Sequence, residues 1–245
     1  MNHHQVGRLR FLWIAILSGF VTLWACTKII FGSYLVKNYR PYVDLIMQKW
    51  SNRLLTLVKA KVQVTGIEHF PKEPNQSVIV VCNHTSLYDI PISQIALNTS
   101  LRMLTKKELY KIPIFATALK KGEFVSVDRH NHENALKDLQ RAKEKMRDGI
   151  TLWVAPEGTR SNGDSLLNFK TGGFHLAIDT KAMIVPLVIQ NAYSLQAGKN
   201  LSLNLHQTIK VELLAPIDAS NTPGQKAKEL AQQVRQKMLE CLQKR

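Results

Sequence analysis

The N-terminal part of the chain differs from the rest in its pattern of apolar and polar residues. Residues 11–36 contain one charged side chain, Lys28, and a helix of this length is long enough to cross or deeply enter a bilayer. A helix buried in a soluble core is disfavoured because the segment is apolar on every face. A cleaved signal peptide is disfavoured because the apolar run continues beyond any small-residue cleavage site. The pattern therefore predicts a membrane-associated helix.

Basic residues flank this helix on both sides. Residues 1–65 contain nine lysines and arginines and one acidic residue, Asp44. Basic flanks favour the cytoplasmic side of a membrane, so both ends of the helix are expected there. Two arrangements agree with this pattern. The segment either dips into the membrane and returns, with Gly32 and Ser33 at the bend, or spans the membrane once with a weak orientation signal.

A second helix is predicted over residues 42–58, with one apolar face and an opposite basic face. Its apolar positions are Val43, Ile46, Met47, Trp50, Leu54, Leu57 and Val58. Such a helix either lies on an anionic membrane or packs on a globular domain, and the pattern alone does not separate the two. We expect residues 1–60 to form a membrane-embedded or interfacial helical anchor, followed by a domain over residues 61–245.

Residues 61–245 alternate short apolar runs with amphipathic segments. The run SVIVVC (77–82) is typical of a strand buried on both faces. Strands that alternate with helices indicate an α/β fold, and we expect a mixed, largely parallel central sheet flanked by helices. Strands are predicted over 77–82, 101–105, 124–127, 151–155 and 183–189, with one or two more in 201–214. Helices are predicted over 90–97, 108–119, 131–147, 172–179 and 223–242.

The charge balance narrows the function classes. Of 245 residues, 33 are lysine or arginine and 18 are acidic, which gives a net charge of +15. This surplus indicates an anionic partner: nucleic acid, an anionic membrane surface or a phosphorylated substrate. Nucleic acid is disfavoured because the chain shows no DNA- or RNA-binding motif and such a role leaves the apolar N-terminus unexplained. One basic cluster comprises Arg102, Lys106, Lys107, Lys111, Lys120 and Lys121. The three cysteines are isolated, which excludes a disulfide framework and a CxxC metal site.

Candidate catalytic residues lie where the strand 77–82 ends. His84 follows this strand, at the edge where open α/β sheets bind their ligands, and Asp89 lies five residues further on. On one continuous helix these side chains would lie about 140° apart, so they meet only if His84 lies in the turn before the helix. The carboxylate would then hold one imidazole nitrogen and leave the other free as a base. With no obvious serine or cysteine nucleophile, this pair favours direct attack by a substrate hydroxyl.

Three further segments carry residues of interest. In APEGTRS (155–161), Glu157 and Arg160 lie in a turn after a buried strand, and an arginine fork suits a phosphate monoester. A surface loop with a local Glu–Arg ion pair is the alternative. GEFVSVDR (122–129) ends a strand in Arg129, and IVPLVI (184–189) is typical of a buried strand.

Together with NHTSLYD (83–89), these segments resemble, in order, the four sequence blocks of the glycerophospholipid acyltransferase family. The resemblance is closest to its bacterial 1-acylglycerol-3-phosphate acyltransferases and covers roughly residues 60–215. Two positions depart from the family pattern. Ala155 stands where an aromatic residue is usual, and Ser126 where a bulkier residue is usual. These departures bear on the acyl or head-group pocket more than on the reaction.

The resemblance implies a role for each matching residue. His84 would take the proton of the sn-2 hydroxyl of 1-acylglycerol-3-phosphate, and Asp89 would orient the imidazole. The hydroxyl would attack the thioester of acyl-CoA or acyl-carrier protein, and phosphatidic acid would form. The acceptor site would comprise Glu157, Gly158, Thr159 and Arg160, with Arg129 nearby, Lys106 as a further member and Arg160 on the phosphate.

No metal or other cofactor is expected, because the acyl donor is itself an activated substrate. The expected partners are a membrane lipid acceptor, acyl-CoA or acyl-carrier protein, and an anionic membrane surface. The expected location is the membrane, with the catalytic domain on the cytoplasmic face of the inner membrane. Two alternatives stay open: acylation of another lyso-acceptor, such as a lysophospholipid or lyso-aminolipid, and a peripheral scaffold, which the presence of His84 and Asp89 disfavours.

Overall fold

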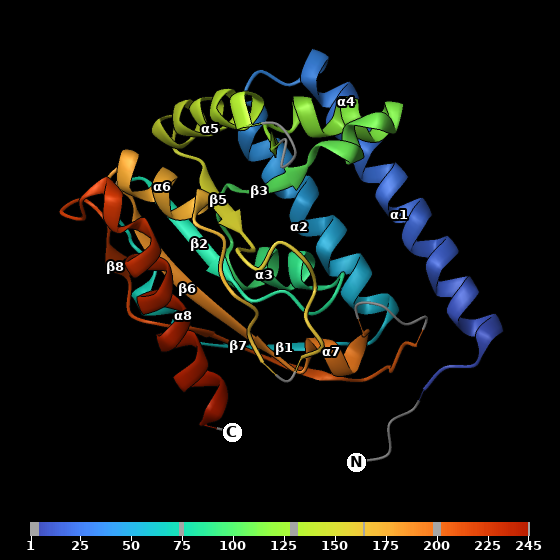
Figure 1. The fold of residues 1–245 in the computed structure, drawn as a ribbon. Helices are drawn as coiled ribbons and strands as arrows, with labels where there is room; N and C mark the ends of the chain where they lie inside the picture. The colour runs from blue at the N-terminus through green and yellow to red at the C-terminus, as the bar shows by residue number, and fades with distance from the viewer. Residues whose placement is uncertain (1–4, 74–75, 128–131, 164, 198–201, 245) are drawn as a thin grey trace.

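The computed structural model describes residues 5–73, 76–127, 132–163, 165–197 and 202–244. Two long N-terminal helices lie along one side of a central sheet, and further helices cover both faces of that sheet (Figure 1). The expected α/β fold with a preceding apolar helix is therefore confirmed.

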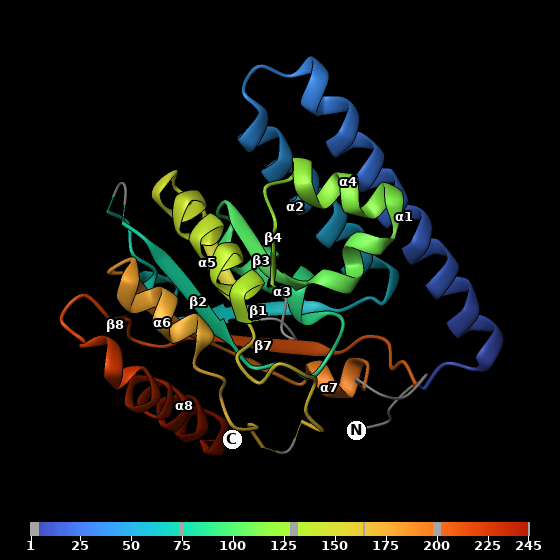
Figure 2. The same ribbon diagram turned by 45° about the horizontal axis from the view of Figure 1, so that its top comes forward.

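The two N-terminal helices, α1 (Arg8–Leu35) and α2 (Tyr39–Leu57), form an antiparallel hairpin (Figures 1 and 2). Helix α1 continues through Gly32 and Ser33, so the possible bend at these residues does not form, and the chain reverses at residues 36–38. The structure requires glycine at position 32 for another reason: a Cβ atom there would clash with the ring of Tyr42 on α2. The glycine therefore lets the two helices approach closely.

Helix α2 is packed on both sides, which answers the question that its sequence left open. It lies between α1 and α3 (Asp89–Leu97), and its predicted apolar face is buried at Val43, Ile46 and Met47. These three residues pack with Ala25, Cys26 and Ile29 of α1, whereas Leu55 of α2 packs in the core with Ile92 of α3. The Arg53 guanidinium adds a contact to α1, 3.8 Å from the centre of the Trp24 ring. Helix α2 is thus a packed helix of the fold.

Over the described residues, the sheet has eight strands. Seven follow the order β1-β7-β6-β2-β5-β3-β4, and β8 pairs with β6. All pairs are parallel except β6 with β7 and β6 with β8. The strands are β1 (Lys61–Thr65), β2 (Val78–Cys82), β3 (Leu101–Lys106), β4 (Val125–Val127), β5 (Thr151–Val154), β6 (Met183–Gln190), β7 (Thr208–Leu213) and β8 (Ile217–Asp218). The predicted mixed, largely parallel sheet is confirmed.

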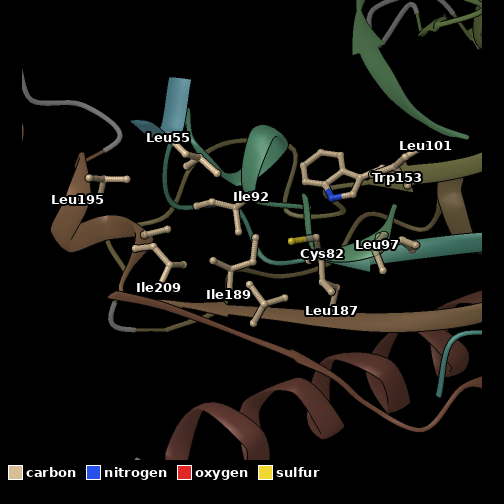
Figure 3. Close-up of a cluster of buried hydrophobic side chains, with 14 of the residues drawn as sticks. Leu55, Cys82, Ile92, Leu97, Leu101, Trp153, Leu187, Ile189, Leu195 and Ile209 are labelled. Carbon is tan, nitrogen blue, oxygen red and sulfur yellow. The ribbon is translucent and has the colours of Figure 1, made fainter. Parts of the chain in front are cut away.

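Two hydrophobic cores lie on opposite faces of the sheet, as the alternation of side chains along a strand requires. Val80 and Cys82 of β2 face the core under α3, where Ile92, Leu55 and Trp153 also pack (Figure 3). Ile79 and Val81 face the other core. Its helices are α5 (His132–Arg147), α6 (Gly172–Asp179) and α8 (Ala227–Gln243). The remaining helices are α4 (Pro113–Lys121), α7 (Ala192–Leu195), η1 (Ile67–His69), η2 (Lys107–Lys111) and η3 (Gly224–Lys226).

Several elements differ from the sequence-based expectation. The helix predicted over 108–119 is divided into η2 and α4, because Pro113 has no N–H to continue a helix and begins a new one instead. The short strands β1 and β8 were not predicted. Strand β1 has no buried side chain, so it lacks the apolar pattern that identifies a strand.

The prediction that Arg102 belongs to an exposed basic cluster is wrong. Its side chain is fully buried on β3, where Nη1 donates to the Asp44 carboxylate of α2 at 2.7 Å and Nε donates to the Gly122 carbonyl at 2.6 Å. Alternation along β3 turns this side chain inward. Arg102 therefore ties α2 to the sheet and does not face an external anion.

Candidate active site

The site begins where β2 ends. The side-chain amide of Asn83 donates to the carbonyl of Ile189 on β6 at 2.9 Å and accepts from its N–H at 2.8 Å. This side chain keeps the chain beside β6 after the regular pairing of β2 ends. His84 therefore starts a turn at a well-defined point of the sheet edge.

The structure brings His84 and Asp89 together. His84 lies in the turn and Asp89 is the first residue of α3, and Nδ1 of His84 lies 2.8 Å from Oδ2 of Asp89. An ionised carboxylate can only accept, so Nδ1 carries the proton and Nε2 is left as an acceptor. The imidazole side chain is 22% exposed, whereas the carboxylate is fully buried. This arrangement can present a base to a ligand at the surface of the site.

The Asp89 carboxylate is held in place by the turn itself. Its Oδ2 also accepts the backbone N–H groups of Thr85 and Ser86, at 2.7 and 2.9 Å. The second oxygen, Oδ1, is buried and has no hydrogen-bond partner among the described residues. Because three donors converge on one oxygen, the side chain has a single orientation, and the imidazole is oriented with it.

Trp153 of β5 supports the imidazole from the core. The two rings meet edge to face with centroids 6.1 Å apart. The indole N–H donates to the Ser93 hydroxyl at 3.0 Å, and that hydroxyl donates to the Asp89 carbonyl at 2.8 Å. Cys82 is fully buried in the same core, and burial raises the pKa of its thiol, so it is no candidate nucleophile.

The loop after β5 holds the backbone of His84 on both sides. Glu157 Oε1 accepts the His84 N–H at 2.7 Å, and the Ser161 N–H donates to the His84 carbonyl at 2.7 Å. The other oxygen of Glu157 accepts the Leu167 N–H at 2.9 Å. Burial raises the pKa of the Glu157 carboxyl, against the lowering effect of these two N–H groups. Glu157 was expected in the acceptor site, and its geometry favours bracing the base over touching the acceptor.

The other expected site residues lie at different places. Gly158 adopts a left-handed conformation with φ +73°, which favours glycine. Thr159 is exposed, and Arg160 is half-buried with no ion-pair partner in the described part of the chain. Lys106 ends β3 at the same sheet edge, although its side chain is not among those described. Arg129 lies outside the described residues.

A partly open apolar cavity lies beside this site, between α1, α2, α4 and β3. Ile90, next to Asp89, and Met103, which pairs with Trp153 across β3 and β5, are part of its lining. The other lining residues are Thr22, Ala25, Cys26, Ile29, Met47, Trp50, Thr105, Leu109, Phe115, Ala118, Leu119 and Phe124. An open apolar groove between α1 and the start of α4 shares Thr22, Cys26 and Phe115 with it. The cavity can hold a hydrocarbon chain.

Comparison with known proteins identifies the family. The model of the family described as Acyltransferase matches residues 61–190, which include the His84–Asp89 turn and the loop that holds it. The chain belongs to the acyltransferase family. The resemblance stated from the four sequence blocks is therefore confirmed.

This acyltransferase is similar to several named relatives. The 1-acyl-sn-glycerol-3-phosphate acyltransferase of Haemophilus influenzae is 30% identical over 76% of this chain and 76% of its own length. The protein of the same name from Saccharomyces cerevisiae is 33% identical over 74% of this chain, and the match spans 59% of the yeast protein. The crystal structure of the 1-acyl-sn-glycerophosphate (LPA) acyltransferase of Thermotoga maritima superposes with a TM-score of 0.80 at 26% identity, covering 97% of this chain and 96% of that one.

Sequence reasoning missed two features of the acyltransferase site. Trp153 carried no signal beyond that of a buried strand residue, and its contact with His84 depends on β5 lying next to β2. The apolar cavity depends on α1 packing against α4, elements far apart in the chain. Among the described residues, no group of three or more His, Cys, Asp or Glu side chains lies close enough together to hold a metal ion.

Proposed function

We propose that this acyltransferase transfers a fatty acyl group from acyl-CoA or acyl-carrier protein to the sn-2 hydroxyl of 1-acylglycerol-3-phosphate, forming phosphatidic acid. The observation that carries the proposal is the His84–Asp89 pair, in which one imidazole nitrogen is fixed at 2.8 Å and the other is open as a base. The names of the relatives support the acceptor.

The proposed reaction needs one base and no covalent enzyme intermediate. Nε2 of His84 accepts the proton of the sn-2 hydroxyl as its oxygen bonds to the thioester carbonyl carbon. The buried Asp89 carboxylate stabilises the imidazolium that forms. When the tetrahedral intermediate collapses, the C–S bond breaks, and the thiolate leaving group takes the proton back from the imidazolium. The enzyme is thereby restored to its starting state.

The substrates divide between two parts of the site. The acyl chain suits the apolar cavity, whose lining exposes no polar surface and reaches Ile90 beside Asp89. The phosphate of the acceptor suits the guanidinium of Arg160, which can donate two parallel hydrogen bonds. Positioning both substrates at His84 supplies catalysis beyond proton transfer.

The apolar outer face of α1 supports the proposed membrane location. Helix α1 is long enough and apolar enough to cross a membrane. One side packs on α2 and α4, while Trp13 and Phe20 remain about two-thirds exposed. Because its inner side is covered by protein, we infer that α1 lies in the lipid surface or dips into it. Exposed Ile112 and Ile114 line the adjoining groove and extend this apolar surface. The basic flanks favour the cytoplasmic face.

An acylation assay with purified protein tests both the identity of the acceptor and the role of His84 as the base. In mixed micelles with acyl-CoA, 1-acylglycerol-3-phosphate should be acylated at least tenfold faster than lysophosphatidylcholine, a lyso-aminolipid or monoacylglycerol. Acyl-carrier protein thioester in a parallel assay identifies the donor. His84→Ala should lower turnover by about 10²–10⁴-fold without changing the circular dichroism spectrum. Equal rates on all acceptors would overturn the proposed acceptor, and normal turnover of His84→Ala would overturn the base.

A further inference from the structure

The segment 166–170 is attached to the loop that holds His84. Its Leu167 N–H donates to Glu157 at 2.9 Å, and the Lys170 N–H donates to the Pro156 carbonyl at 2.9 Å. These two bonds join the segment to the beginning of the loop at two points. The backbone of Lys170 therefore has a defined place beside residues 156–160.

Helix α8 holds the same segment from outside. Arg235 donates through Nε to the Leu167 carbonyl at 2.9 Å and through Nη2 to the Leu166 carbonyl at 2.6 Å. The ring of Phe169 stacks on that of Phe174, with centroids 6.2 Å apart. The segment is thus braced by α8 and α6, so the position of Lys170 does not rest on the loop alone.

The side chain of Lys170 lies across Gly158. An ideal Cβ atom on Gly158 would come within 2.9 Å of Lys170 Cε and 3.1 Å of its Nζ. Glycine at this position therefore provides both the left-handed backbone and the space for the lysine stem. The ammonium group consequently lies beside Gly158, which precedes Arg160 by two positions in the sequence.

Two cationic side chains, those of Arg160 and Lys170, belong to this loop and the segment attached to it. Lys170 is exposed, and in the described ranges neither it nor Arg160 has a carboxylate within salt-bridge distance. Glu157 is buried, and each of its oxygens already accepts a backbone N–H. Two cationic residues on this loop and its neighbouring segment favour a ligand that carries more than one negative charge.

We propose that Lys170 is a second phosphate-binding residue of the acceptor site, joining Arg160 on the phosphomonoester of 1-acylglycerol-3-phosphate. This inference rests on the function proposed above. A phosphomonoester carries close to two negative charges at neutral pH and three acceptor oxygens. The guanidinium can bind two oxygens in a fork, and the ammonium can bind the third as a point charge. Acyl-CoA also carries phosphate groups, so the test must separate acceptor from donor.

Lys170→Met removes the charge and keeps the stem over Gly158. We expect KM for 1-acylglycerol-3-phosphate to rise about tenfold, with kcat within threefold of wild type and KM for acyl-CoA unchanged. Lys170→Arg should restore KM to within threefold. The matched control is Lys181→Met, an exposed lysine just before β6, at the opposite sheet edge from the site, which should leave both KM values unchanged.

The outcomes separate this inference from the proposed function. An unchanged acceptor KM in Lys170→Met, with normal melting temperature, overturns the role of Lys170 while the wild-type preference for phosphomonoester acceptors still stands. A rise in KM for acyl-CoA alone assigns the ammonium to the donor and also overturns it. If Lys170→Met melts early, Lys170→Gln and Lys170→Arg are compared at the same temperature. Equal acceptor KM values in that pair overturn the role.

Discussion

The charge of Asp89 can be separated from its orienting role by the substitution Asp89→Asn. All three hydrogen bonds to the side chain end on one oxygen, Oδ2, including those from Thr85 and Ser86. An asparagine oxygen in that position keeps every bond and the imidazole tautomer. Its amide nitrogen takes the place of Oδ1, which is buried without a partner in the described part of the chain. The variant therefore loses the negative charge while the geometry is conserved.

The expected fall in kcat of Asp89→Asn follows from the distance between the carboxylate and the imidazolium. A carboxylate and an imidazolium about 4 Å apart, at an effective dielectric constant of ~20, attract each other by about 4 kcal/mol. If the transition state loses this stabilisation, kcat falls by about 10³-fold. The buried amide N–H₂ costs a further ~1–3 kcal/mol of folding free energy, so we also expect a lower melting temperature.

The assay is steady-state release of the CoA thiol at saturating acceptor and donor. KM for both substrates should change less than threefold, because the Asn variant keeps the site in place. Asp179→Asn, an exposed carboxylate at the end of α6, is the control and should turn over like wild type. A kcat of Asp89→Asn within threefold of wild type would refute the reasoning, since the carboxylate would then only orient the imidazole.

Three further predictions concern the hydrogen bonds of Glu157 to the site, the loss of folding stability at low pH, and the exposed apolar face of α1. Glu157→Gln turns an amide N–H₂ toward the N–H of His84 or Leu167, and we expect kcat to fall at least tenfold in thiol-release assays; unchanged kcat would show that the brace is dispensable. The Arg40 guanidinium lowers the pKa of Glu123 to about 2. The ionised Glu123 carboxylate therefore stabilises the folded state by about 3 kcal/mol. This contribution is complete above pH 4.5 and is lost as pH falls from there toward 2. Glu123→Gln should therefore flatten the loss of unfolding free energy over that window in denaturant titrations, and parallel curves would contradict the assignment. Replacing Trp13 and Phe20 together by serine should reduce co-sedimentation with anionic vesicles at least tenfold; wild-type sedimentation would argue against α1 as the membrane contact.

The spacing of residues along the sequence was sufficient to predict part of this structure. The apolar residues of SVIVVC predicted a strand buried on both faces, and β2 has that environment. The five-residue separation of His84 and Asp89 excluded a shared helix, so the pair had to bridge a turn and a helix start, as it does. These predictions succeeded because helix period, strand alternation and turn geometry depend on a few neighbouring residues.

Contacts between distant segments were decided by the tertiary structure. Glu157 meets His84 across 73 positions because β5 pairs with β2, and Arg102 turned from an expected surface cation into a buried partner of Asp44. The burial of α2 likewise depended on which elements came to lie on each side of it. A sequence records which residues are apolar or charged, but strand order and helix packing select their partners. The sequence alone thus determined most of the elements and the His–Asp pair, whereas the packing of the sheet and helices decided which residues hold that pair and where the apolar cavity lies.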